Sequence, residues 1–185
     1  MREAQKPTRA AMVLLLRPVE PNGFEVFLTR RPDEMAFLGG MYCFPGGAVQ
    51  KDDCASAMLR LCHGLSPAGA RRTVGAHFSP PEALGFWIAG IRELFQKVGI
   101  LFAVDHSGKT WPAARERGHN LPDKHAALLK KTLTFRCLLE DEELLCDASR
   151  LVYFSHWQTP EQSSIRFDTR FFIAVLPDDQ HPFPA

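Results

Sequence analysis

The stretch 79–102, SPPEALGFWIAGIRELFQKVGILF, constrains the fold most, because its own residues specify both ends of a helix. Ser79 is suited to cap a helix, Pro80 to its first position, and Glu82 completes a Ser-x-x-Glu capping box. Gly99 stands where helices commonly close in a left-handed residue. The sequence therefore predicts one long helix between these signals.

This predicted helix, about residues 82–98, has two chemically different faces. On one side Glu93, Gln96 and Lys97 leave the helix together, because their spacings are one, three and four residues. We expect chemistry on that polar face. The other face is an apolar stripe at helical spacing, predicted to be buried: Leu84, Ile88, Ile91, Phe95 and Val98.

Length and composition favour one globular domain over residues 1–185, since 45% of the residues are hydrophobic and 23% charged. A formal net charge of +1 gives no general attraction to nucleic acid or to an anionic membrane, so we expect neither partner and only a local phosphate-binding surface. The odd number of cysteines, five, favours a reduced compartment, and we expect the cytoplasm. The apolar run at residues 10–16 is too short to span a membrane.

The rest of the chain reads as alternating strands and short helices. Asn22 and Gly23 indicate a turn between the first two strands. The expected strands are residues 10–17, 24–30, 150–157 and 165–176, with Phe24, Val26 and Leu28 on an apolar face of the second. The expected helices are residues 55–62, 123–133 and 136–144, and a loop rich in Gly, Pro and Ser is expected over 64–81.

Two separated segments carry a family resemblance. Phe44-Pro-Gly-Gly47, followed by Arg92-Glu-Leu-Phe-Gln-Lys-Val-Gly-Ile100, resembles the Nudix box, whose second half reads Arg-Glu-aliphatic-x-Glu-Glu-x-Gly-aliphatic. A long insert, residues 48–81, separates the two halves and is similar to that of the branch that includes the peroxisomal coenzyme A diphosphatases. The resemblance implies an α+β fold, the Nudix α/β/α sandwich with a mixed sheet.

The resemblance also implies an activity and its residues. Nudix hydrolases cleave a nucleoside-diphosphate-linked small molecule by attack of water on phosphorus, assisted by Mg²⁺ or Mn²⁺. Glu93 and Arg92 would be catalytic, Gly46 and Gly47 would contact the diphosphate, and Glu93 with Gly46 would hold the metal. Gln96 and Lys97 stand where the family has two metal-binding glutamates.

Three arginines are further candidates for substrate binding. Arg30, in the pair with Arg31, either meets phosphate or is an ordinary solvated side chain. Arg166 and Arg170 flank Asp168 on one strand face, so they either hold a phosphate or form an ion-pair ladder.

Sequence alone leaves several alternatives open. Asp53 stands at the spacing of the first Nudix glutamate, but it comes before most of the insert, and its equivalence is open. The insert is either a wall over the substrate or surface elaboration. Glu93 either binds metal or pairs with Lys97 one turn away. The family has a further strand and closing helix, so we expect a short or divergent C-terminus here.

Two classes of function follow from the substitutions at Gln96 and Lys97. One is a diphosphate hydrolase with a weakened metal site, with coenzyme A or its esters as favoured substrates. The other is a Nudix-fold module that binds a ligand or a protein partner without turnover.

Overall fold

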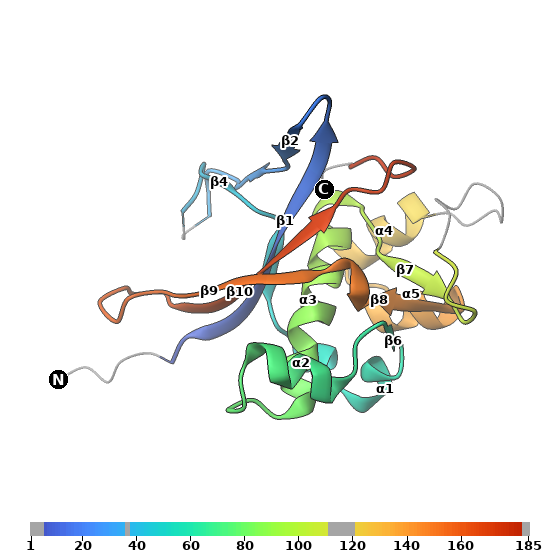
Figure 1. The fold of residues 1–185 in the computed structure, drawn as a ribbon. Coiled ribbons are helices and arrows are strands. Elements are labelled where there is room, and N and C mark those ends of the chain that lie inside the picture. Colours follow the sequence, from blue (N-terminus) through green and yellow to red (C-terminus); the bar gives the residue numbers. More distant parts are fainter. Residues whose placement is uncertain (1–5, 36–37, 111–120, 183–185) are drawn as a thin grey trace.

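The computed structural model describes residues 6–35, 38–110 and 121–182, and its fold is a mixture of helices and strands around a mixed sheet (Figure 1). The central sheet has the order β2-β1-β10-β9, with β5 also paired to β1. The strands are β1 (Thr8–Val19), β2 (Gly23–Val26), β3 (Thr29–Arg30), β4 (Tyr42–Cys43), β5 (Gly46–Ala48), β6 (Cys62–His63), β7 (Ala103–Asp105), β8 (Leu144–Asp147), β9 (Val152–Gln158) and β10 (Phe167–Val175). The predicted α+β class with a mixed sheet is confirmed.

Strand β1 organises this sheet because it pairs on both sides. It runs parallel to β10, with Thr8 opposite Phe167 at one end of the register. On its other side it is antiparallel to β5 over its first half and to β2 over its second. The glycine-rich β5 is therefore held in the sheet, directly beside the most buried part of β1.

Helix α3 (Pro80–Val98) is the helix predicted from the sequence, and it packs against β1 and β5. The capping box forms as expected: the Glu82 backbone N–H donates to Ser79 Oγ, and the Glu82 carboxylate accepts from the Ser79 N–H at 2.9 Å. Gly99 closes the helix with a φ of 72°, which is the left-handed conformation that favours glycine. All five residues of the predicted apolar stripe are fully buried.

The remaining helices gather near α3 in Figure 1, with α1 and α2 at one end of it and α4 and α5 at its side. Strand β6 follows α1 and, with β8 and β7, forms a second sheet. The helices are η1 (Asp52–Cys54), α1 (Ser56–Leu59), α2 (Pro67–Val74), α4 (Leu121–Leu129), α5 (Phe135–Asp141) and η2 (Ala148–Arg150).

The loop expected over residues 64–81 was wrong, because α2 occupies its middle. Ser66 caps this helix by accepting a hydrogen bond from Gly69 N–H at 3.0 Å, and Pro67 takes a first-turn position. Helix-starting residues were thus mistaken for loop residues, since Ser, Pro and Gly serve both purposes. The short helix expected at 55–62 ends at Leu59, and the helix expected at 136–144 ends at Asp141, after which the unpredicted strand β8 begins.

The second expected strand, 24–30, is interrupted. Its first part, β2, pairs with β1, whereas Thr29 and Arg30 pair with β4 in a separate two-stranded sheet. The expected apolar face is not covered: Phe24 is 66% exposed, because β2 lies at the edge of the sheet. Among the described residues, no helix is long and apolar enough to cross a membrane.

Candidate functional site

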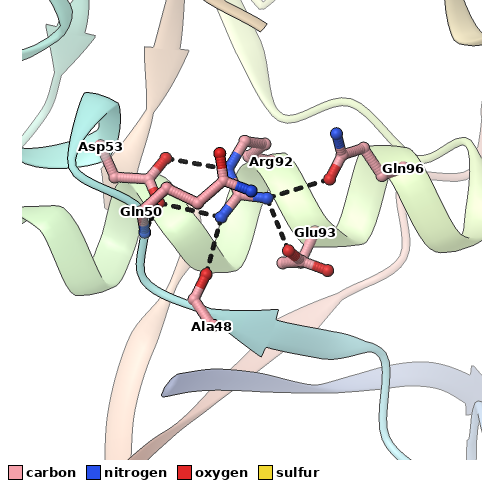
Figure 2. A network of polar contacts seen from close by, with 6 residues as sticks. All are labelled: Ala48, Gln50, Asp53, Arg92, Glu93 and Gln96. Carbon is pink, nitrogen blue, oxygen red and sulfur yellow. Dashed lines mark hydrogen bonds and ion pairs between the residues drawn. The ribbon is translucent and has the colours of Figure 1, made fainter. Parts of the chain in front are cut away.

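Arg92 lies at the centre of a buried polar network where α3 passes β5 (Figure 2). Its Nε donates to Asp53 Oδ1 and its Nη2 to Asp53 Oδ2, both at 2.9 Å. Nη2 also donates to the Ala48 carbonyl at 2.9 Å, and Nη1 donates to Glu93 Oε1 at 2.5 Å and to Gln96 Oε1 at 2.9 Å. All five N–H groups of the guanidinium therefore have acceptors within the chain.

This network holds Arg92 in its charged form. Burial lowers the pKa of Arg92, but the hydrogen bonds and charge of Asp53, followed by those of Glu93, more than offset burial and raise it. Arg92 is 3% exposed and Asp53 2%, so the pair is a buried, bidentate ion pair. Arg92 therefore positions the surrounding groups and has no free donor for a ligand.

Asp53 is the site residue that sequence reasoning left undecided. The structure brings it to Arg92 across 39 positions of sequence, in η1, just after the glycine-rich β5. Its Oδ2 also accepts the Gln50 backbone N–H at 2.8 Å, which ties the start of the insert to α3. Its spacing after Gly47 was the available signal, since Asp53 lies near the start of the insert and most of the inserted residues follow it.

Gly47 has a steric reason to be glycine. A Cβ atom at this position would lie 2.5 Å from Glu93 Cδ and 2.5 Å from Glu93 Oε2. At Gly46 a Cβ would lie 2.2 Å from the Ala11 carbonyl oxygen, across the β1–β5 pair. The glycines thus allow β5 to approach β1 at Gly46 and the Glu93 carboxylate at Gly47, while the roles expected for both glycines in binding metal and diphosphate stay predictions.

A cavity of about 550 Å³ opens beside this network. Its walls have a polar and an apolar part, which come from α3, the start of the insert, and the α4–α5 region. The polar part comprises Gln50, Asp52, Asp53, Arg92, Glu93, Gln96, Lys97, Lys131, Thr134 and Arg136. The apolar part comprises Met58, Leu128, Leu129, Leu133 and Phe135.

The residues around Glu93 do not fit a tightly held divalent cation. Glu93 Oε1 and Gln96 Oε1 both accept from Arg92, so the position between these two oxygens holds a guanidinium nitrogen. Lys97, one turn further along α3, adds another positive charge to the same cavity. Within the described part of the chain, no group of three or more His, Cys, Asp or Glu side chains is arranged to hold a metal ion. Glu93 pairs with Arg92 and not, as one alternative had it, with Lys97.

The three arginines suggested as substrate ligands lie outside the walls of this cavity. Arg30 pairs with Asp33 at the surface. Arg170 is buried, pairs with Asp168 at 2.5 Å and lies over the rings of Phe78 and Phe86, at 5.1 and 5.0 Å from their centroids. These contacts match the ion-pair alternative for Arg170 and also attach the insert residue Phe78 to the sheet.

Arg166, the third of these arginines, is buried as well. Its Nε donates to the Thr159 carbonyl at 3.2 Å, which joins the start of β10 to the loop that follows β9. A substrate role for any of the three arginines stays a prediction.

Comparisons with known proteins give consistent matches. The family model described as the NUDT19 Nudix domain matches residues 2–184. The human acyl-coenzyme A diphosphatase NUDT19 is 26% identical over 195 residues, covering 91% of this chain and 52% of that protein. The Gallus gallus protein of the same name is 26% identical over 200 residues, covering 86% of this chain and 50% of its own. The chain thus spans about half the length of these curated relatives.

A solved structure has the same fold. The crystal structure of a NUDIX hydrolase from Alicyclobacillus acidocaldarius matches with a TM-score of 0.77 over 99% of this chain and 76% of that one, at 23% sequence identity.

Proposed function

This chain belongs to the NUDT19 Nudix domain family, and from that premise we propose that its Arg92–Glu93 cavity binds and slowly hydrolyses a nucleoside-diphosphate-linked small molecule. Coenzyme A and its esters are the favoured substrates, because the curated relatives are named acyl-coenzyme A diphosphatases. The observation that carries the proposal is the Glu93 carboxylate, held by Arg92 under Gly47 and exposed to the cavity.

The reaction is the addition of water across a P–O–P linkage. The water oxygen forms a bond to one phosphorus, the bond from that phosphorus to the bridging oxygen breaks, and two phosphate monoesters leave. In our proposal Glu93 accepts the proton of the attacking water, because it is the carboxylate fixed at the cavity by both a guanidinium and a close backbone. Arg92 acts by positioning Glu93.

We expect Mg²⁺ or Mn²⁺ to bind weakly. In a family site the helix face carries three glutamates, whereas Glu93, Gln96 and Lys97 sum to zero charge. A lysine about 5 Å from a divalent ion opposes it by about 6–7 kcal/mol at an effective dielectric constant of about 20. Solvent exposure of Lys97 reduces this opposition, but the sign favours slow, weakly metal-dependent turnover.

The test is a substrate panel with product identification. Coenzyme A, an acyl-coenzyme A, ADP-ribose and a dinucleoside polyphosphate are incubated with and without Mg²⁺, and the phosphate monoesters are identified by mass spectrometry. We expect slow cleavage of coenzyme A or its ester, and loss of kcat but not of binding in Glu93→Gln. A preference for ADP-ribose or the dinucleotide would overturn the substrate assignment.

The second candidate is a ligand-binding module without turnover. It is favoured by the same Arg92 contacts, since Nη1 already lies against the oxygens of Glu93 and Gln96. In that case the panel would give saturable binding of a diphosphate compound, with no product formed even at high Mg²⁺ and high protein concentration.

A further inference from the structure

The cavity beside Glu93 has an excess of positive side chains outside the Arg92 network. Lys97 comes from α3, Lys131 follows α4, and Arg136 lies in α5, so three separate segments bring cations to one cavity. Asp52 is the one carboxylate of this wall that does not belong to the network. These four residues together carry a formal charge of +2.

Within the polar network, the cation that faces the Glu93 carboxylate is the guanidinium of Arg92. Arg92 Nη1 lies 2.5 Å from Glu93 Oε1 and 2.9 Å from Gln96 Oε1, and so occupies the position between these two oxygens. The positive charges that remain on the cavity wall are therefore available to an anion. A diphosphate, which carries several negative charges on closely spaced oxygens, matches such a wall.

We propose that this wall binds the diphosphate group of the ligand directly through Lys97, Lys131 and Arg136, without a divalent cation. This inference rests on the proposed function, because it concerns the same cavity and the same class of ligand. It replaces metal-bridged recognition of phosphate by recognition through side chains of the chain.

The geometry of each cation is suited to this role. Arg136 Nη1 donates to both carboxylate oxygens of Glu140, at 2.7 and 2.8 Å, and both partners are about two-fifths exposed. Such a surface pair is weak, so the guanidinium fork can turn to a phosphate at little cost. Lys97 and Lys131 are exposed and supply mobile point charges, which adapt to different phosphate positions.

The experiment measures binding of ADP and of coenzyme A by isothermal titration calorimetry, once in EDTA and once in Mg²⁺. We expect binding in EDTA with an affinity close to that in Mg²⁺. Lys131→Gln and Arg136→Gln should each raise the Kd in EDTA by about tenfold, the effect of losing one charge-assisted hydrogen bond.

Two control variants test whether the change in Kd comes from the cations that line the cavity. Lys130→Gln removes the same charge from the neighbouring exposed position, which does not line the cavity, and should leave the Kd unchanged. Glu140→Gln breaks the pair with Arg136 but keeps the guanidinium, so its Kd should stay the same or fall. Thermal unfolding of each variant reports whether the fold is retained.

Each outcome decides the proposal. Binding that requires Mg²⁺ would overturn direct recognition and leave the proposed function standing. Binding in EDTA that Lys131→Gln and Arg136→Gln weaken no more than the controls would show that other residues hold the phosphate. Absence of binding in both conditions would overturn the proposed function as well.

Discussion

Replacing Asp53 with asparagine should destabilise the protein severely, because three donors converge on this buried carboxylate. Arg92 Nε and Nη2 and the Gln50 N–H all donate to it. Asparagine keeps one acceptor oxygen and presents an NH₂ group to the donors of the other. With the oxygen turned toward Arg92 Nη2 and the Gln50 N–H, the buried Arg92 Nε loses its acceptor, at about 1–3 kcal/mol, and the buried charge of Arg92 loses its main partner. The expected loss is about 3–5 kcal/mol, the usual range for a broken buried ion pair.

This loss is large enough to measure by two methods. For a chain of this length it corresponds to a fall in Tm of about 6–20 °C, at about 2–4 °C per kcal/mol. Urea unfolding gives the free energy directly. Asp52→Asn is the matched control, because Asp52 precedes Asp53 but is exposed, and its effect should stay within about 0.5 kcal/mol.

A double-mutant cycle tests the partner. Asp53→Asn, Arg92→Gln and the double variant should show a coupling energy of about 1–3 kcal/mol, since the two side chains contact each other in a buried site. If Asp53→Asn destabilises no more than Asp52→Asn, or if the two substitutions are additive, the Asp53–Arg92 pair does not hold the insert to α3 and the reasoning fails.

Three further predictions concern α3 and the neighbouring strand β5. Gln96→Glu with Lys97→Glu should strengthen Mg²⁺ binding by at least about tenfold in calorimetric titration, because the change adds two carboxylates to the cavity and removes one ammonium group. An unchanged affinity would refute the electrostatic account. Gly47→Ala should lower kcat and cost about 1–3 kcal/mol in urea unfolding, since its Cβ would lie 2.5 Å from Glu93 Cδ; wild-type values for both would contradict the close approach. Hydrogen bonds from Arg9 and Ser79 lower the pKa of Glu82 from 4.5 to about 2. The ionised Glu82 side chain therefore stabilises the folded protein by about 1 kcal/mol or less, an effect that is complete above pH 4.5 and is lost as the pH falls toward 2. The stability difference between wild type and Glu82→Gln should shrink over that window, and a difference that stays constant would exclude the linkage.

Elements whose signals lie within a few residues were predictable from the sequence. The α3 helix is an example: its capping box, its closing glycine and its buried stripe were all expected and all form. Capping involves residues three positions apart, and the stripe follows from 3.6 residues per turn, so no distant part of the chain is needed. Reliance on local signals also explains why the loop predicted over residues 64–81 was wrong. Ser66 and Pro67 start a helix there, and local composition alone did not distinguish a helix start from a loop.

The role of a polar side chain, in contrast, was decided by contacts between distant segments. For Glu93 the sequence left open whether the carboxylate holds a metal or pairs with Lys97, and the structure places Arg92 Nη1 against it. Arg170 was expected either to meet phosphate or to form an ion pair, and the structure pairs it with Asp168 and places it over the rings of Phe78 and Phe86. A charged side chain makes the contacts that the surrounding fold leaves within its reach, and spacing along one strand does not contain that information.

What the sequence determined by itself is therefore the α+β class, the family motif and the long capped helix, because these follow from periodicity and from neighbours along the chain. Only the tertiary structure decided that Asp53, near the start of the insert, is the partner of Arg92, and that Lys97, Lys131 and Arg136 share one cavity. The physical reason is that electrostatic and hydrogen-bonding partners are selected by distance in space, and folding brings together residues that no local pattern connects.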